Sequence, residues 1–253
     1  MRRALIDSTV WVTGASSGIG RELALQLARR GNRVVATARS VDSLATLVDE
    51  GGGNIMALPW DITDATRIEA VTRQLQAMVP RLDVAVLNAG TCEYLDSTAF
   101  DPALCRRVFT TNIDGLVNSL AVALPALRKS SVPCIAGVSS LSTYLPLPRA
   151  EAYGASKAAV RYFLESLRVD LAREGIAVSV ISPGFVKTPL TDRNDFPMPA
   201  MISADTAARR IISGIERRKF EVAFPRRLAW TMRAIGWLPA RWVFRLSQKI
   251  ARS

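Results

Sequence analysis

Tyr153 and Lys157 stand four positions apart at the start of a helical pattern, so both side chains project from one face of that helix. A free tyrosine has a pKa of about 10 and exchanges protons poorly at neutral pH. An ammonium group close to the phenol favours the phenolate and so lowers that pKa. The pair therefore predicts proton transfer, in which Tyr153 protonates a developing alkoxide or takes the proton of an alcohol.

A serine hydroxyl near this pair would stabilise the oxygen whose charge changes. Ser140 lies thirteen residues before Tyr153, just after the end of an apolar run. There its hydroxyl would donate a hydrogen bond to a substrate carbonyl as negative charge develops on it. Ser139 is its immediate neighbour and, from the residues alone, the alternative.

A glycine-rich segment joins the first apolar run to the first helical pattern, and it reads Thr13-Gly14-Ala15-Ser16-Ser17-Gly18-Ile19-Gly20. Gly14 suits a tight turn, Gly18 lets the backbone approach a pyrophosphate, and Gly20 permits close contact between helix and strand. The N–H groups at the helix N-terminus would face the anion. Three glycines alone are a weak signal, but the strand before and the helix after them predict a dinucleotide-binding loop.

The end of the second apolar run bears on the choice of cofactor. The segment Thr37-Ala38-Arg39-Ser40 has no carboxylate before Asp42. A carboxylate there would accept a hydrogen bond from a ribose 2′-OH, whereas a guanidinium pairs with a 2′-phosphate. Arg39 therefore favours NADP(H) over NAD(H), and the alternative is an arginine that is solvated in a loop.

The chain has 253 residues and no histidine, which excludes a Ser-His-Asp triad, a Cys-His dyad and an H-E-x-x-H zinc site. Cys92, Cys105 and Cys134 lie far apart and form no C-x-x-C pair, which is typical of free thiols in a reducing compartment. Proton chemistry must therefore use other groups, and no metal site is expected.

Short apolar runs alternate with longer amphipathic segments through most of the chain. The runs span residues 9–13, 33–38, 54–58, 84–88, 133–139, 177–182 and 220–223, and the helical segments residues 18–30, 64–79, 101–129, 153–174 and 203–218. Continuous apolar runs are typical of strands that are buried on both faces of a parallel sheet. We therefore predict an α/β fold with a doubly wound sheet, which binds ligands at the carboxyl ends of its strands.

Several of these motifs together resemble the short-chain dehydrogenase/reductase family. The matching positions, in the family's order and spacing, are residues 13–20, Asp61, Asn88-Ala89-Gly90, Asn112, Ser140, Tyr153, Lys157 and Pro183-Gly184. The resemblance covers roughly residues 5–225 and is closest to the family's branch of about 250 residues. It implies a single Rossmann-type domain around a seven-stranded parallel sheet flanked by helices. It also implies hydride transfer between a nicotinamide cofactor and a carbonyl or secondary alcohol.

The resemblance also implies roles for residues around the reacting atoms. It selects Ser140 over Ser139, and it gives Lys157 the further role of holding the nicotinamide ribose. Asn112 would complete a proton relay through Lys157 and water. An asparagine inside a helix also bonds to backbone, which does not exclude the relay.

The expected cofactor site combines the glycine-rich loop, Arg39 and family positions after later strands. By resemblance, Asp61 accepts from the adenine amino group, and Thr188 belongs to the loop that receives the nicotinamide carboxamide. The full set is Gly14, Ser16, Ser17, Gly18, Ile19, Gly20, Arg39, Asp61, Ile62, Asn88, Ala89, Gly90, Tyr153, Lys157, Pro183, Gly184, Val186 and Thr188. Leu87 stands where many relatives have a second asparagine, and no catalytic position is missing.

The positive charge of the chain gathers at its C-terminal end. The net charge is +11, and residues 209–253 hold twelve Lys/Arg against two Glu, so the remainder is close to neutral. Arg241, Arg245 and Lys249 recur at every fourth position, and Trp242 begins an apolar stripe one position round. We predict a basic amphipathic helical extension of the domain. It could lie on an anionic membrane, cap the substrate site or pack in a subunit interface.

We accordingly expect a catalytic domain over residues 1–225 and the extension over residues 226–253. Loops 91–101, 141–152 and 188–202 would line a largely apolar substrate pocket with Tyr94, Phe100, Tyr144, Leu145, Leu147, Leu190, Phe196, Met198 and Met201. A hydrophobic, lipid-like carbonyl or alcohol is the expected substrate.

We also expect a homo-oligomer, either dimer or tetramer, and a cytoplasmic location, peripheral on the inner face of a membrane if the extension binds lipid. No nucleic-acid partner is expected, because only charge favours one. The alternative function is a catalytically silent NADP-binding or membrane-associated scaffold on the same fold, and intact Ser140, Tyr153 and Lys157 argue against it.

Overall fold

The computed structural model describes the backbone of residues 4–251 and the side chains of residues 4–248. Seven parallel strands form the main sheet in the order β3-β2-β1-β4-β5-β6-β9. They are β1 (Thr9–Thr13), β2 (Arg33–Thr37), β3 (Ile55–Ala57), β4 (Val84–Leu87), β5 (Cys134–Val138), β6 (Ala177–Pro183) and β9 (Glu221–Phe224). The strand order reverses between β1 and β4, which is where such sheets bind ligands. The predicted doubly wound α/β fold is confirmed.

Strand β1 shows why the sheet is apolar on both sides. Its five residues are all buried, and successive side chains enter opposite cores. Val10 and Val12 pack in one core, and Trp11 packs in the other. A strand covered on both faces has no solvated side, which explains its continuous apolar sequence.

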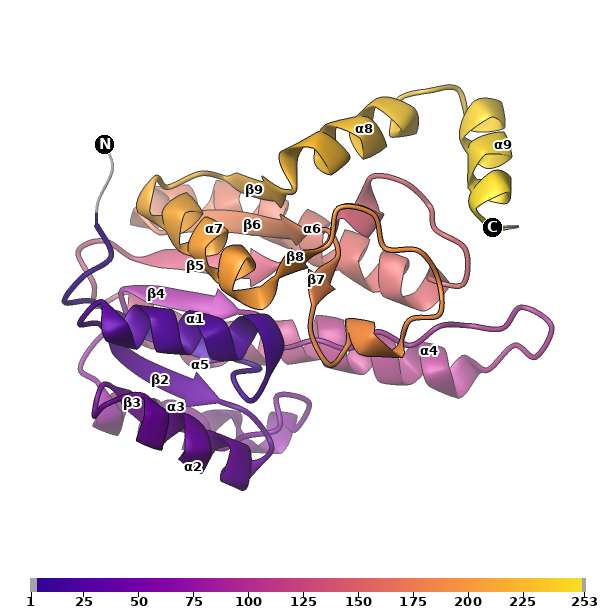
Figure 1. Cartoon of the computed structure of the whole chain (residues 1–253). Helices are drawn as coiled ribbons and strands as arrows, with labels where there is room; N and C mark the ends of the chain where they lie inside the picture. The colour runs from indigo at the N-terminus through magenta and orange to yellow at the C-terminus, as the bar shows by residue number, and fades with distance from the viewer. Residues whose placement is uncertain (1–3, 252–253) are drawn as a thin grey trace.

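Helices cover both faces of this sheet (Figure 1). One face carries α1 (Gly18–Arg29), α2 (Val41–Glu50) and α7 (Ala204–Glu216). The other carries α3 (Ile68–Met78), α5 (Gly115–Leu127) and α6 (Glu151–Leu171), with α4 (Pro102–Phe109) beside α6. Single 3₁₀ turns lie at Ala65–Arg67, Leu141–Thr143, Ala172–Glu174 and Thr191–Arg193. Among the described residues, no helix is both long and apolar enough to cross a membrane.

Three local features differ from the sequence expectation. The helix predicted over residues 101–129 is interrupted by a π-helical turn at Thr110–Asp114, between α4 and α5. Helix α2 is not predicted, although Ser40 caps it by accepting a 3.2 Å hydrogen bond from the Ser43 amide. The small parallel sheet of β7 (Val186–Lys187) and β8 (Ile202–Ser203) has strands too short to show a period.

The C-terminal end forms two helices, α8 (Arg226–Gly236) and α9 (Ala240–Ala251), joined by a short turn. Figure 1 shows α8 leading away from β9 and α9 turning back beside the loop that precedes α6. The Ser247 hydroxyl donates a 3.1 Å hydrogen bond to the carbonyl of Pro146 in that loop. Hence α9 rests on a segment that the sequence predicts to lie beside the substrate.

Candidate active site

The glycine-rich loop has the backbone shape that its sequence predicts. Gly14 and Gly18 have φ of +68° and +55°, which residues with a Cβ rarely adopt. Gly20 has an ordinary φ, but a Cβ there would stand 2.2 Å from the Gly14 carbonyl oxygen. A Cβ on Gly18 would meet the Thr188 methyl group at 3.0 Å, so the loops after β1 and β6 face each other closely.

Asn88, just after β4, holds this loop in place. Its side-chain amide donates to the carbonyls of Thr13 and Gly14 at 3.0 and 3.3 Å. In return the Thr13 hydroxyl oxygen accepts from the amides of Asn88 and Ala89 at 3.1 and 3.2 Å. The two central strand ends are therefore joined by four hydrogen bonds directly below the predicted phosphate site.

A cleft of about 770 Å³ opens at the carboxyl ends of the strands. Every predicted cofactor-binding residue lines it except Gly20, which is packed against Gly14. A Cβ on Gly14 would approach the Ala89 Cα to 2.7 Å, and one on Gly90 would reach within 3.0 Å of the Lys157 nitrogen. The glycines thus leave room for backbone, Lys157 and a flat ligand, so these residues fit a dinucleotide.

Tyr153 projects from the first turn of α6 into this cleft. Burial, with a smaller contribution from the neighbouring Cys92, raises the pKa of its phenol to about 12, although the nearby Ser140 hydroxyl acts in the opposite direction. The sequence expectation that Lys157 lowers this pKa is wrong for the structure. The Lys157 nitrogen lies 5.9 Å from the centre of the ring, and the cost of burying a phenolate outweighs its influence.

Lys157 lies one turn further along α6 and is only 5% exposed. Burial lowers the pKa of its ammonium to about 8, and Cys92 acts in the opposite direction. Its nitrogen donates a 3.0 Å hydrogen bond to the carbonyl of Val138. The charge is therefore held at the floor of the cleft, below the position of a ligand.

The structure separates the two candidate serines. The Ser139 hydroxyl donates a 2.9 Å hydrogen bond to the Lys157 carbonyl, which commits its proton to α6. The Ser140 oxygen accepts a hydrogen bond from the Ser142 amide at 3.1 Å, and its hydroxyl lies close enough to Tyr153 to lower the pKa of that phenol. Ser140 is therefore the serine that interacts with Tyr153, whereas Ser139 lines the cleft wall.

Asn112 occupies the π-helical turn and is 2% exposed. Its side-chain oxygen accepts from the Thr91 amide at 2.8 Å, and its nitrogen donates to the Thr91 carbonyl and the Ser156 hydroxyl. Bonding to backbone is therefore confirmed. Asn112 and Lys157 also approach each other, since both lie 3.0 Å from the point where a Cβ on Gly90 would stand. The turn thus joins the loop after β4 to α6.

Arg39 and Asp61 stand on the part of the cleft near β2 and β3. Arg39 is exposed and lines the cleft, whereas Asp42 on α2 does not. One Asp61 carboxylate oxygen accepts from the amide and hydroxyl of Thr63 at 3.0 and 2.8 Å. The carboxylate is thus fixed by a local turn at the cleft wall.

The predicted substrate loops meet, but not all of their aromatic residues line one pocket. The ring of Tyr94 packs edge-on against Phe196 with centroids 5.4 Å apart, and Phe196 approaches Phe185 at 6.1 Å. Tyr144 donates a hydrogen bond to the half-buried carboxylate of Glu221 on β9, and its side chain lines a different cavity, described below.

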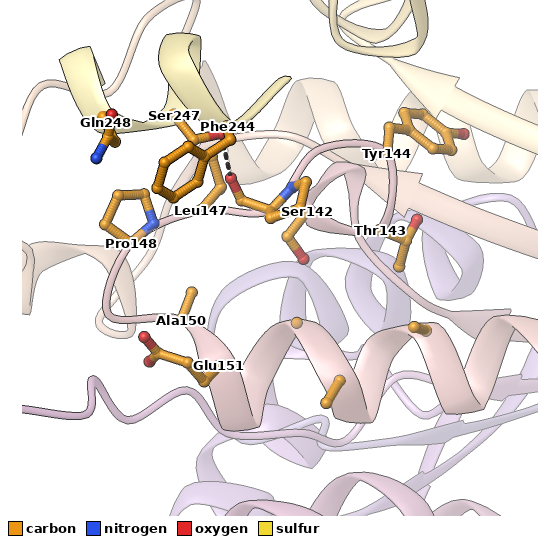
Figure 2. A pocket seen from close by; sticks show the side chains of 14 residues that line it. Ser142, Thr143, Tyr144, Leu147, Pro148, Ala150, Glu151, Phe244, Ser247 and Gln248 are labelled. Atoms are coloured by element: carbon orange, nitrogen blue, oxygen red, sulfur yellow. Dashed lines mark hydrogen bonds between the residues drawn. The ribbon is translucent and has the colours of Figure 1, made fainter. Parts of the chain in front are cut away.

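A second cavity of about 530 Å³ lies between the loop before α6, the outer side of α6 and α9 (Figure 2). Figure 2 shows Leu147 and Pro148 from the loop facing Phe244 and Gln248 from α9. Leu147 and Tyr144, which the sequence predicts to line the substrate pocket, line this cavity. The cavity and the cleft share no lining residue, since Gly154 lines the cavity and its neighbour Tyr153 lines the cleft.

Several residues at the cleft were not predicted as site residues. Cys92 lies close enough to Tyr153 and Lys157 to influence both pKa values, and its own pKa is raised by burial. Its position two residues after Gly90 could have indicated this. Glu93 and Arg107 form a 2.7 Å ion pair at the cleft, and no sequence motif marks them. No cluster of three or more potential metal-ligating acidic or cysteine side chains occurs among the described residues.

Comparison with known proteins adds sequence evidence to this geometry. The family model described as short chain dehydrogenase matches residues 8–196. An uncharacterized oxidoreductase of Myxococcus xanthus is 40% identical over 234 residues, which are 91% of this chain and 92% of that protein. Human dehydrogenase/reductase SDR family member 7 is 36% identical over 200 residues, which are 75% of this chain and 58% of that protein.

Two solved structures have the same fold. A short-chain dehydrogenase/reductase of Burkholderia phymatum in complex with NAD gives a TM-score of 0.82 at 22% identity, covering 90% of this chain and 92% of that one. The RhlG/NADP active-site complex of Pseudomonas aeruginosa gives 0.81 at 25% identity, covering 87% and 96%. Both neighbours hold a nicotinamide cofactor, as the glycine-lined cleft of this chain would allow. The chain is thus an oxidoreductase that belongs to the short-chain dehydrogenase/reductase family.

Proposed function

We propose that the protein is an NADP(H)-dependent oxidoreductase that interconverts a hydrophobic carbonyl compound and its secondary alcohol. The observation that carries the proposal is that Tyr153 lines the same cleft as Lys157 and the glycine-rich loop, with Ser140 near its phenol. A protein that only bound a nucleotide would have no chemical need for this set.

Each of these side chains has a separate task around the substrate oxygen. The nicotinamide supplies or accepts the hydride when bound. Tyr153 delivers a proton to the carbonyl oxygen in reduction, because its raised pKa keeps the phenol protonated at neutral pH. Ser140 donates a hydrogen bond to the same oxygen as negative charge develops there. Lys157 holds the ribose hydroxyls from the floor of the cleft, and Asn112 connects Lys157 to the proton relay.

The preference for NADP(H) rests on Arg39. Its exposed guanidinium lines the cleft at the end of β2, and the next carboxylate, Asp42, does not line it. A guanidinium binds a phosphate through two parallel, charge-assisted hydrogen bonds, whereas a ribose hydroxyl carries no charge and offers no such pair of bonds. We therefore expect Arg39 to favour NADP(H), whose 2′-phosphate it can bind, over NAD(H).

Steady-state kinetics with NADPH and NADH test both parts of the proposal. A panel of carbonyl compounds should give turnover that Tyr153→Phe reduces by a factor of about 100 to 10,000 while cofactor binding persists. Arg39→Ala should raise the KM for NADPH at least about tenfold and leave that for NADH unchanged. Arg33→Ala, at the opposite end of β2, is the matched control. An unchanged NADPH preference in Arg39→Ala would refute the cofactor assignment.

A hydrophobic substrate is supported by the aromatic side chains of the converging loops, among them Tyr94, Phe185 and Phe196. Such a lining binds apolar groups better than charged ones. We expect kcat/KM to rise with the length of the alkyl chain of a ketone. A clear preference for small charged keto acids would overturn this part of the proposal.

We further propose that the protein is a homo-oligomer. The outer side of α6 exposes Tyr162, Phe163 and Val169, at 74%, 40% and 73%, and large exposed apolar side chains on one helix are typical of an interface. Light scattering should give the mass of a dimer or tetramer. Phe163→Glu should reduce that mass, and a monomer in the wild type would contradict the proposal.

A further inference from the structure

The tryptophans of the C-terminal helices face outward. Trp230, Trp237 and Trp242 are 60%, 80% and 47% exposed, whereas Trp11 and Trp60, the other two of the chain, are 0% and 2% exposed. Trp230 and Trp237 are seven residues apart, so they lie on one side of α8. Contiguous exposed aromatic surface marks a site of interaction rather than ordinary solvated surface.

The same helices carry only positive charge. Residues 226–253 contain seven Lys/Arg and no Asp or Glu. Of these, Arg226, Arg227, Arg241 and Arg245 are exposed. The guanidinium carbons of Arg241 and Arg245 lie 6.0 and 5.5 Å from the ring centre of Trp242. Aromatic and cationic groups are therefore exposed together on these two helices, and we name the set the Trp/Arg face (Arg226, Arg227, Trp230, Trp237, Arg241, Trp242 and Arg245).

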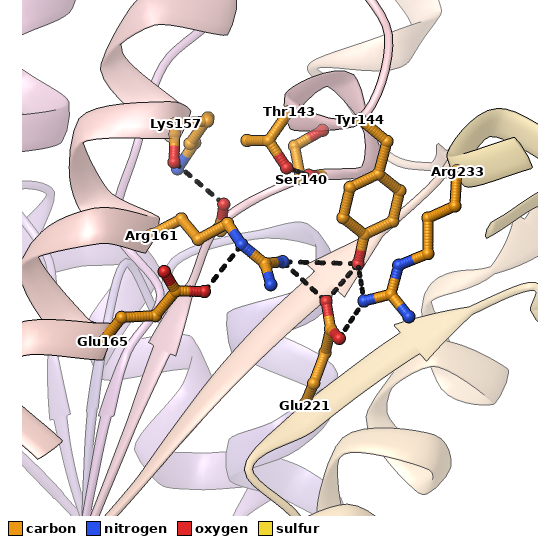
Figure 3. Close-up of polar contacts among 9 residues, drawn as sticks. Ser140, Thr143, Tyr144, Lys157, Arg161, Glu165, Glu221 and Arg233 are labelled. Carbon is orange, nitrogen blue, oxygen red and sulfur yellow. Dashed lines mark hydrogen bonds and ion pairs between the residues drawn. The ribbon is translucent and has the colours of Figure 1, made fainter. Parts of the chain in front are cut away.

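The inner side of α8 is fixed to the domain by a polar cluster (Figure 3). Glu221 on β9 pairs with Arg233 of α8 and, at 2.6 Å, with Arg161 of α6, and it accepts a hydrogen bond from Tyr144. Figure 3 shows the Tyr144 ring standing between the two guanidinium groups, whose carbons lie 5.4 and 4.6 Å from its centre. These contacts fix α8 to the domain, and Trp230 and Trp237, three residues before and four residues after Arg233, stay exposed beside the attachment.

Close packing adds to this attachment. Ala229 on the inner side of α8 is 4% exposed, and a Cβ on Gly236 would stand 2.3 Å from the Tyr144 carbonyl oxygen. Helix α9 is held by the hydrogen bond from Ser247 to Pro146. Rotation of either helix to bury its tryptophans would therefore break these contacts.

We propose that the Trp/Arg face docks the protein on the surface of an anionic lipid bilayer. Tryptophan favours the headgroup region of a bilayer, and arginine is drawn to the phosphate of anionic lipids, so one surface serves both. A second copy of the chain fits less well, since it would bring a like-charged surface against this one. The observed charge thus favours lipid over self-association.

Flotation of the full-length protein with vesicles tests the docking. Vesicles of phosphatidylcholine with 30 mol% phosphatidylglycerol are compared with vesicles of phosphatidylcholine alone. We expect binding to the anionic vesicles only, weakened by salt. Arg241→Gln/Arg245→Gln should lower the partition coefficient roughly 30-fold, because each basic residue near such a surface contributes about 1 kcal/mol and every 1.4 kcal/mol is a factor of ten. Arg29→Gln/Arg33→Gln, at exposed sites remote from α8 and α9, is the charge-matched control and should bind as wild type.

The aromatic part has its own variant and readout. Trp230→Ala/Trp237→Ala should lose lipid binding while its circular dichroism and NADPH binding stay unchanged, and Val41→Ala, on α2, serves as the exposed-apolar control. In the wild type, brominated lipids should quench fluorescence, and the quenching should fall in the tryptophan variant. Equal recovery of wild type and both variants with anionic vesicles would overturn the proposal. A loss of oligomer mass in the tryptophan variant without any lipid binding by wild type would overturn it in favour of a subunit interface.

Discussion

The ammonium nitrogen of Lys157 donates a 3.0 Å hydrogen bond to the carbonyl of Val138, the last residue of β5. Lys157 therefore has two roles: it places a charge at the cleft, and its buried hydrogen bond joins α6 to β5. Burial lowers its pKa from 10.5 to about 8, so keeping it protonated at neutral pH costs the folded state free energy.

Lys157→Met should therefore stabilise the protein at neutral pH while it abolishes activity. Between pH 8 and 10.5 the folded state binds fewer protons than the unfolded state, so the free energy of unfolding of the wild type rises with pH across that window. Below pH 8 Lys157 is charged in both states, and the full cost of burying its charge destabilises the wild type. At pH 7 we expect the variant to be more stable by about 2 kcal/mol, after the lost bond to Val138 is counted. Urea unfolding at several pH values measures this, and a difference independent of pH would contradict it.

Gly20→Ala should damage the cofactor site through sterics alone. Its Cβ would stand 2.2 Å from the Gly14 oxygen and 2.5 Å from the Asn88 amide nitrogen, so the loop must shift. We expect a loss of about 2 kcal/mol in unfolding free energy and at least about tenfold weaker NADPH binding by fluorescence titration. Gly154→Ala is the control, since a Cβ there meets nothing within 4 Å. It should be as stable as wild type or more so.

Asp83, at the start of β4, should govern stability in acid. It is 3% exposed, and it accepts hydrogen bonds from the Ser130 hydroxyl at 2.6 Å and the Thr9 amide at 2.9 Å. Burial acts to raise its pKa, but these bonds and Arg81 outweigh burial and lower it below 3.8. The stabilisation is therefore present above that value and is lost as pH falls through the folded-state pKa.

Replacing this carboxylate should accordingly matter most at neutral pH. Asp83→Asn should cost about 2 kcal/mol at pH 7, because at least one buried donor loses its acceptor. The gap to wild type should narrow below about pH 4, where the wild-type carboxylate also becomes protonated. Thermal unfolding between pH 3 and 7 checks this, and a gap that widens in acid would exclude the assignment.

Glu221→Gln should loosen α8 without unfolding the domain. The carboxylate is half-buried, and although burial acts to raise its pKa, Arg161, Tyr144 and Arg233 lower it overall. Removal of its charge leaves two guanidinium groups facing each other. Hydrogen exchange should therefore speed up in residues 226–236 and stay unchanged in α1, as mass spectrometry of peptides would show. Glu165→Gln, which removes only the 2.9 Å pair with Arg161, should leave α8 as slow as in wild type.

The sequence predicts the sheet well because each strand is a short apolar run with polar boundaries. Strand β1 coincides with its predicted range, and the other six differ from theirs by one or two residues. Asn112 is different: its position was predicted, but the π-helical turn that carries it was not, since the amphipathic period continues through it. The polar contacts of Tyr144 were not predicted, because its partners Glu221 and Arg233 are 77 and 89 residues away, beyond any local pattern.

The pKa of Tyr153 was misjudged for a related reason. Residue spacing gives the Tyr153–Lys157 proximity, but the depth of burial depends on how the loop after β4 covers both groups, which no motif expresses. The fold and the membership of the site were thus accessible from residue order. The balance between desolvation and charge at its centre was not.

The hydrogen bonds from Asn88 to Thr13 and Gly14 are made entirely within the chain. The curvature of the glycine-rich loop is consequently a property of the protein itself, and a dinucleotide does not have to impose it. If the loop were flexible, binding would have to fix the backbone of several residues, and the conformational entropy lost in doing so would weaken the affinity for the dinucleotide. Because the residue after β4 already holds the loop, little of the free energy of the phosphate contacts is spent on ordering the loop when a dinucleotide binds.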